Sequence, residues 1–456
     1  MNAEILSRVQ FAATSAFHYI FPPISIGLGL MLVLFEWYYL RTGDQFYKNT
    51  AKFWVKVFAL VFAIGVASGI VLEFQFGTNW SKYSRYTGDI FGSALAAEGV
   101  FAFFLESGFL ALLVFGWDRV SKRTHFVSTC LVALGAHFSA IWIIVANSWM
   151  QTPAGYKIVG SGINERAEIT DFWAMVLNPS TVDRLTHTVV GAWMTGAFLV
   201  MSISAFYILK NRHLDFAKFS MKLGFAIALL ASFLQIFLGH QSAVGVAKNQ
   251  PSKMAALEGH YQTGPMDLYA FGWVNASTGQ VTGLKIPVPG FGSTLLSGSS
   301  STVIKGLDEF AIEDRPPVNM TFQAYHLMVA LGFAMAAIVV ATGIQMARGK
   351  LWESPGLLKI LVIAVVFPQL ANQSGWMAAE VGRQPWIVFG LLRTKDALSP
   401  SVSAGEILTS LILIVSMYLG LLALFIYLLN KRIQAGPDQI DKVSEEVPLL
   451  SKGIAQ

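Results

Sequence analysis

The chain has 456 residues, of which 54% are hydrophobic and 13% are charged, with a net charge of +5 and a mean hydropathy of +0.55. A soluble protein of this length would carry about twice that share of charged residues, so the composition excludes an ordinary soluble enzyme. The single cysteine, Cys130, excludes intrachain disulfides, cysteine-ligated iron–sulfur clusters and thioether-attached haem.

Apolar runs recur along the whole chain, and each is long enough to cross a bilayer as a helix. The first run is too long for the apolar part of a signal peptide, so we interpret it as a retained span. The sequence predicts an all-α, polytopic membrane helix bundle with about nine transmembrane helices, over residues 10–40, 52–75, 92–116, 125–147, 184–209, 217–240, 320–345, 357–378 and 404–430.

The links between these segments alternate in charge, which in a membrane protein indicates orientation rather than nucleic-acid binding. The basic links contain Arg41, Lys48, Lys52, Arg119, Lys122, Arg123, Lys210, Arg212, Lys218, Arg348, Lys350, Lys431 and Arg432. The other links are poorer in lysine and arginine. Because cytoplasmic loops carry the excess of basic residues, we expect the N-terminus outside and the C-terminus in the cytoplasm.

Four regions follow from this pattern. Residues 1–240 hold transmembrane helices 1–6, residues 320–430 hold helices 7–9, and residues 431–456 form a cytoplasmic tail. Between them, residues 241–319 form one long polar connection on the outer side, rich in Gly, Ser and Pro. A loop of this length is typically functional.

Ionisable residues inside spans are costly and are functional candidates by default, although each taken alone could equally be satisfied by a neighbouring helix. The candidates are His18, Glu98, Glu106, His137, His187, His326 and Glu380. With a rise of ~1.5 Å per residue, most of them fall in the outer third to half of the bilayer. One polar layer on one side predicts buried cofactors that are reached from the outside.

Two spacings within this set suggest chemistry. Glu98 and Glu106 lie ~12 Å apart along one helix, which suits a proton relay as well as two unrelated carboxylates. Met328 lies at about the level of His187, and a His/Met pair is a good ligand set for haem iron. Most methionines in spans simply pack, so the spacing by itself does not select Met328.

The segment GWMAAEVGRQPW, residues 375–386, resembles a signature of subunit I of the cytochrome bd-type quinol oxidases. Five further segments resemble this family in the same order: RVQFAATSAFHYIFPPISIGLGL, AAEGVFAFFLESGF, RLTHTVVGAWMTGAF, QPSKMAALEGHYQT and YHLMVALGF. The resemblance implies an enzyme that oxidises quinol and reduces dioxygen to water with three haems and no copper.

The resemblance also implies roles for single residues. His18 and Glu380 would be axial ligands of the two active-site haems, haem b595 and either haem d or a further haem b. His187 and Met328 would ligate haem b558. Glu98 would lie near the active-site haems, Glu106 on the proton route, and Lys253 and Glu258 at the quinol site. Trp376 would lie between haems, and Arg383 would pair with a glutamate or a haem propionate.

The implied partners are ubiquinol or menaquinol, dioxygen, a second membrane subunit and a small single-helix subunit, in a bacterial or archaeal plasma membrane. This chain departs from better-known members in two ways. His326 stands where they carry arginine, and it is a second possible iron ligand if the helix register shifts. The outer loop is short and lacks the C-terminal extension of long-loop members, and the segments SWMQTP and EGHYQT resemble the cyanide-insensitive branch.

Three other interpretations compete. A secondary transporter would explain Glu98 and Glu106, but not the histidines and methionine on one side, and the sequence has no evident inverted repeat. A haem–copper oxidase would need clustered histidines, whereas the eight in this chain include no adjacent pair. Lys253 and Glu258 could also be an ordinary solvated pair in a polar loop.

Overall fold

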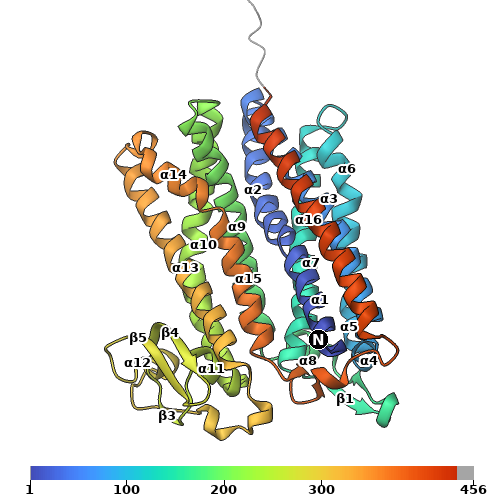
Figure 1. The fold of residues 1–456 in the computed structure, drawn as a ribbon. Helices are drawn as coiled ribbons and strands as arrows, with labels where there is room; N and C mark the ends of the chain where they lie inside the picture. Colours follow the sequence, from blue (N-terminus) through green and yellow to red (C-terminus); the bar gives the residue numbers. More distant parts are fainter. Residues whose placement is uncertain (1, 439–456) are drawn as a thin grey trace, which may run out of the picture.

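The computed structural model describes residues 2–438 and is a bundle of long, roughly parallel helices (Figure 1). In this part of the chain, nine helical segments are long and apolar enough to cross a membrane. They are Ala3–Thr42, Gln45–Thr78, Gly88–Phe115, Lys122–Gln151, Thr181–Leu209, Leu214–Asn249, Ile312–Ala347, Pro355–Val381 and Ala404–Ala435. The predicted multi-pass helical architecture is confirmed. We call the end that carries the N-terminus the outer end, following the predicted orientation.

Six of these segments are built mainly from one long helix each: α3 (Gln45–Thr78), α7 (Lys122–Gln151), α9 (Thr181–Leu209), α10 (Leu214–Asn249), α13 (Val318–Ala347) and α16 (Ala404–Ala435). The predicted sixth span ended at residue 240, whereas α10 continues to Asn249. The first nine residues of the predicted outer loop are therefore helical. Of the predicted tail, residues 431–435 end α16, and residues 439–456 lie outside the described part of the chain.

The remaining three segments are interrupted. The first is divided into α1 (Ala3–His18) and α2 (Phe21–Thr42), and prolines occupy the first turn of α2. The third consists of α5 (Gly88–Ala97), a π-helical turn (Glu98–Phe103) and α6 (Phe104–Phe115). The eighth is divided into α14 (Pro355–Ile363) and α15 (Val366–Val381). Two interruptions coincide with His18 and Glu98, as irregular helix turns often do at functional sites.

Shorter elements cover the outer end of the bundle. The helices are α4 (Ser81–Tyr86), α8 (Phe172–Val176), α11 (Pro251–Glu258) and α12 (Phe291–Ser297). The described residues also form four antiparallel strand pairs: β1 (Tyr156–Val159) with β2 (Arg166–Ile169), β3 (Gly264–Pro265) with β6 (Val303–Ile304), β4 (Tyr269–Asn275) with β5 (Gln280–Lys285), and β7 (Trp386–Val388) with β8 (Leu392–Arg393).

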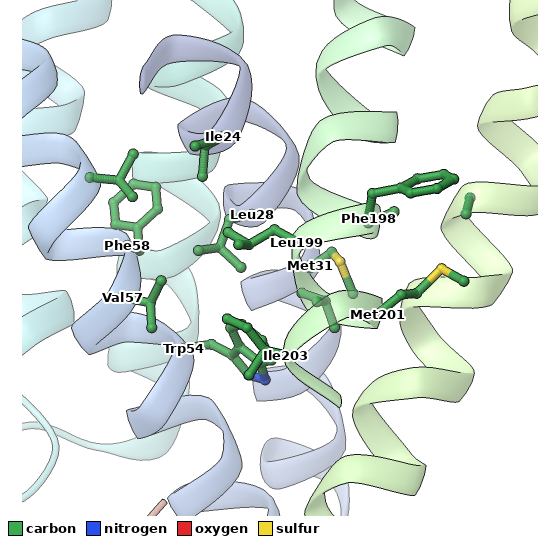
Figure 2. Close-up of a cluster of buried hydrophobic side chains, with 14 of the residues drawn as sticks. Ile24, Leu28, Met31, Trp54, Val57, Phe58, Phe198, Leu199, Met201 and Ile203 are labelled. Carbon is green, nitrogen blue, oxygen red and sulfur yellow. The ribbon is translucent and has the colours of Figure 1, made fainter. Parts of the chain in front are cut away.

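The packed centre lies between α2, α3, α9 and α10 (Figure 2). Large side chains such as Trp54 and Phe198 are fully buried there. Helices α2 and α9 approach so closely that a Cβ atom on Gly27 would lie 2.2 Å from the backbone oxygen of Ala192. Lipid gives no hydrophobic drive to helix association, so close contact at glycine supplies the packing energy instead.

A buried acid–base pair lies near the inner end of the bundle. The Oε1 atom of Glu36 on α2 is 2.5 Å from the Nδ1 atom of His125 on α7. Thr129 donates a hydrogen bond of 2.5 Å to the other carboxylate oxygen. The side chains of Glu36 and His125 are only 2% and 4% exposed. This pair joins α2 to α7 and contains one acidic and one basic group.

Candidate active site at the outer end

Glu380 lies one residue before the end of α15 and is surrounded by donors. The side-chain amides of Asn147 and Gln151, one turn apart on α7, donate to its Oε1 atom over 3.2 and 3.1 Å. Arg383 forms an ion pair with its Oε2 atom. Helix α15 ends at Val381, so Arg383 reaches back over the last turn to the carboxylate. Every hydrogen bond favours the ionised carboxylate, which is a suitable anionic ligand for a ferric ion.

Two further cations adjoin Glu380. Arg184 on α9 donates to the side-chain oxygen of Asn147, and Lys253 on α11 donates to those of Gln151 and Gln250, the latter over 2.7 Å. Lys253 is only 2% exposed and Arg383 4%. Burial, with help from the two neighbouring guanidinium groups, holds the pKa of Lys253 well below its ordinary value, although Glu380 opposes the shift.

The cluster around Glu380 therefore contains three basic side chains and one carboxylate, and some of its donors lack partners. Among the described residues, the Nε and Nη1 atoms of Arg383 and the Nε atom of Arg184 are buried without a hydrogen-bond acceptor. Buried cations without acceptors are costly. The donor set fits a bound group that carries carboxylates, as the propionates of haem do.

Trp376 connects this cluster to the break in the first span. Its ring contacts Tyr19 edge to face, with the centroids 5.4 Å apart, and the guanidinium of Arg184 lies 5.7 Å from its centroid. Tyr19 directly follows His18 at the end of α1. One aromatic side chain thus lies between the segment that carries His18 and the Glu380 cluster.

The histidine and methionine candidates pack against glycines. The Nδ1 atom of His18 is 3.0 Å from the hydroxyl of Ser68, and a Cβ atom on Gly69 would lie 3.1 Å from the His18 ring. A Cβ atom on Gly239 would lie 3.6 Å from the ring of His187. A Cβ atom on Gly375 would lie 2.8 Å from the sulfur of Met328. These residues fit axial ligation of haem.

Other histidines are occupied by protein partners. Both ring nitrogens of His137 are paired, with the backbone oxygen of Ala133 and the indole of Trp193. Both ring nitrogens of His326 face backbone oxygens, those of Phe322 and Tyr269. Among the described residues, no group of three or more His, Cys, Asp or Glu side chains could hold a metal ion.

Glu98 and Glu106 lie on the third membrane segment and face α7. Glu98 begins the π-helical turn and accepts a hydrogen bond of 2.6 Å from Ser139. Glu106 packs directly on Gly135, where a Cβ atom would lie 2.7 Å from its Cγ atom. Both carboxylates are half-buried against one helix. The arrangement is compatible with a relay along α7.

Lys253 and Glu258 lie on the same short helix α11 but do not pair with each other among the contacts of the described residues. Glu258 is 3% exposed, and its Oε2 atom is 3.9 Å from the Nε2 atom of His326. Burial raises the pKa of Glu258 to about 7, while a hydrogen bond from Tyr325 opposes the shift. The idea of an ordinary solvated pair is therefore wrong, because both side chains are buried and bound to other groups.

The structure thus brings Glu380, Arg383, Lys253 and Trp376 into one cluster and places Glu258 in a second group with Tyr325 and His326. Sequence reasoning missed Arg184, Asn147 and the role of Gln151 in holding Glu380. Arg184 precedes His187 by three residues and therefore shares its helix face. A cation one turn from a candidate haem ligand was the available signal.

These features define a class: a multi-pass membrane protein whose histidine, methionine and glutamate side chains could hold haem, with a buried basic cluster at one end. The family model for cytochrome bd terminal oxidase subunit I matches residues 6–437. Cytochrome bd ubiquinol oxidase subunit 1 of Bacillus subtilis is 39% identical, with 100% of this chain and 98% of that protein covered. Cytochrome bd-II ubiquinol oxidase subunit 1 of Escherichia coli is 34% identical, covering 98% and 99%.

The structure is also similar to that of the bd oxidase from Geobacillus thermodenitrificans, with a TM-score of 0.88 and 27% identity over 96% of this chain and 99% of that one. The chain belongs to the cytochrome bd oxidase subunit I family. It is accordingly a terminal oxidase subunit, a haem-containing quinol:oxygen oxidoreductase that oxidises quinol and reduces dioxygen. The resemblance that the sequence motifs indicated is confirmed.

Proposed function

We propose that this chain binds all the haems of a copper-free oxidase, takes quinol at the outer end of the bundle, and separates charge across the membrane as it reduces dioxygen to water. The observation that carries the proposal is the cluster in which Glu380 is surrounded by Arg383, Arg184 and Lys253. Its excess of buried positive charge suits a group that bears carboxylates.

The haems, when bound, would accept electrons from quinol one at a time and deliver them to dioxygen. His187 and Met328 would hold haem b558. His18 and Glu380 would hold the two active-site haems, b595 and either haem d or a further haem b. Arg383 and Arg184 would bind propionates, and Trp376 would lie between the haems.

Quinol would bind beside α11. A carboxyl with a pKa of about 7 can take a proton from a quinol hydroxyl at neutral pH, and Glu258 would do so at its Oε2 atom before releasing the proton outside. The side-chain nitrogen of Lys253 donates to Gln151 and Gln250 and would also hydrogen-bond a quinol oxygen.

The protons consumed by dioxygen would come from the inner side, past Glu106 and then Glu98. Release of quinol protons outside and uptake inside would separate charge without a pump, given the orientation with the N-terminus outside. Such charge separation would serve an energy-converting membrane, which we take to be a bacterial or archaeal plasma membrane.

A second membrane subunit and a small single-helix subunit would complete the enzyme. The third membrane segment supports such packing, because a Cβ atom on Gly92, Gly99 or Gly108 would meet no atom within 4 Å in the described chain. Small residues on a membrane helix permit close approach of another helix. Ubiquinol and menaquinol both fit the proposed chemistry.

Oxygen consumption by the purified enzyme complex tests the proposal. With quinol as the sole reductant, the wild type should consume oxygen, and Glu258→Gln should lower kcat about 100-fold because the proton acceptor is lost. Glu313→Gln, which changes an exposed carboxylate of the same outer region, is the matched control and should have no effect. An assembled, colourless complex without quinol oxidation would overturn the proposal and favour a transporter.

A further inference from the structure

The β4–β5 hairpin presents an apolar face that no other described segment covers. Phe271, Trp273 and Leu284 are 62%, 64% and 55% exposed, whereas Val274 on the opposite face is 2% exposed. Side chains alternate between the two faces of a strand, so Phe271 and Trp273 point the same way. Phe271 is directly opposite Leu284 in the pairing, which makes the three residues one continuous patch.

This hairpin lies beside the outer turns of a membrane-spanning helix. Strand β4 is attached along α13 at three points: the backbone of Val274 to the side chain of Asn319 (3.1 Å), that of Gly272 to Gln323 (2.6 Å), and that of Tyr269 to His326 (3.0 Å). These three helix residues cover about two turns, or ~10 Å of axis. Figure 1 shows the hairpin at the level of the helix ends, at the edge of the bundle.

Helix α13, to which β4 is attached, also exposes the apolar side chains of Met320 and Leu327. Polar groups limit its depth, since Lys285 and Asp267 form an ion pair of 2.5 Å at the end of β5. Lysine can extend its charged end to the headgroups while its stem remains in apolar surroundings. Tryptophan and other aromatic residues favour the boundary between headgroups and acyl chains.

We propose that the Phe271–Trp273–Leu284 face is inserted at the headgroup–acyl boundary of the outer leaflet, and that it fixes the quinol site at the depth from which quinol enters. The role of this face in setting the depth of the quinol site rests on the proposed function. The link is direct: the backbone oxygen of Tyr269 contacts His326, whose Nε2 atom is 3.9 Å from Glu258. The hairpin thus joins the membrane surface to the proton acceptor through one histidine.

Nitroxide labels on the enzyme complex in phospholipid nanodiscs test the insertion. In a Cys130→Ser background, labels would be placed at Phe271→Cys and Trp273→Cys, with Ser277→Cys in the hairpin turn as the control. Ser277 is expected on the aqueous side, because the turn follows Val274, which is attached at the outer start of α13. We expect oxygen to relax the first two labels more than a water-soluble nickel chelate does, and the reverse at position 277.

Two results would overturn the insertion: nickel access at all three positions, which means an aqueous hairpin, or protection of 271 and 273 from both reagents, which means coverage by another protein chain. Enzyme kinetics tests the role of this face in setting the depth of the quinol site. The variant Phe271→Ser/Trp273→Ser should raise KM about tenfold for a long-chain quinol and leave kcat, and KM for a short-chain soluble quinol, unchanged. Equal KM changes for both quinols would refute the depth-setting role. A wild type without quinol oxidation would refute the proposed function but leave the label result intact.

Discussion

The two buried clusters of ionisable groups at opposite ends of the bundle differ in their charge balance. At the inner end, Glu36 pairs with His125, and Thr129 donates a hydrogen bond to the Glu36 carboxylate. At the outer end, Glu380 meets Arg383, with Arg184 and Lys253 close by. The inner pair matches one acid with one base, whereas the outer cluster sets three basic side chains around one carboxylate.

This difference distinguishes polar groups that only join helices from polar groups that bind a ligand. A matched pair can serve only to join two helices, because each group offsets the cost of burying the other. A cluster with an excess of buried cations is costly unless another anion joins it. We therefore interpret the inner pair as a structural link and the outer cluster as a binding site for haem carboxylates.

The largest effect is expected at the outer cluster. Glu380→Leu removes its carboxylate and leaves three basic side chains together, so the folded enzyme should lose ~3–5 kcal/mol of stability. Loss of the ligand should also lower quinol oxidase activity at least ~100-fold. Haem content and oxygen consumption of the purified complex measure both effects. Retention of full haem content would show that Glu380 is not a ligand.

The inner pair should behave differently. His125→Leu alone leaves Glu36 buried without its base and should cost ~3 kcal/mol. The double variant Glu36→Leu/His125→Leu should recover most of that loss, to within ~1 kcal/mol of the wild type, because no buried charge remains. Thermal unfolding of the complex measures stability, and activity per haem should stay unchanged. Loss of activity in the stable double variant would give the inner pair a functional role.

A smaller effect concerns pH at the quinol site. If deprotonated Glu258 accepts the quinol proton, the active form increases as pH rises through its pKa of about 7. We expect kcat/KM for quinol to rise about tenfold between pH 6 and pH 8 and then to level off. In Glu258→Gln the residual rate should not show this rise. A rise of the same size in that variant would assign the titration to another group.

The smallest effect is expected at the glycine beside Met328. Gly375→Ala places a methyl group 2.8 Å from the present position of the Met328 sulfur. The flexible methionine can move aside, so the haem should remain bound with a changed midpoint potential and an activity loss of about threefold or less. Gly356→Ala, in the same membrane segment, is the control, because nothing in the described chain lies near its added methyl. Identical potentials in both variants would place Met328 away from the iron.

Most of the bundle could be predicted from the sequence, because twenty-residue apolar runs have few alternatives in a bilayer. The break after His18 had a signal, because Pro22 and Pro23 occupy the first turn of α2 and proline does not continue a helix. The π-helical turn at Glu98 could not be predicted, because it lies inside a continuous apolar run, where hydropathy does not distinguish one helical geometry from another. Strands β4 and β5 could not be predicted either, because the alternation of residue types is hard to detect in a loop rich in glycine and serine.

The site was partly predictable for a related reason. Glu380 and His187 are conspicuous because they are ionisable groups in apolar segments. Lys253 and Glu258 lie in a polar stretch, where the composition does not show which side chains are buried. Their burial comes from tertiary packing against α7, α10 and α13. Arg184 resembles an ordinary cation at the start of a helix, and only the approach of Asn147 and Trp376 shows it to be part of the cluster.

The central claim is that the outer end of this chain holds haems through two separate ligand sets. A dithionite-reduced minus oxidised absorption spectrum of the complex tests it most directly, with haem extraction on the same sample, for the wild type, His187→Ala and Glu380→Leu. We predict haem b bands in the wild type, selective loss of the low-spin haem b signal in His187→Ala, and selective loss of an active-site haem signal in Glu380→Leu. Unchanged spectra in both variants, or a colourless wild type that is correctly assembled, would contradict the account.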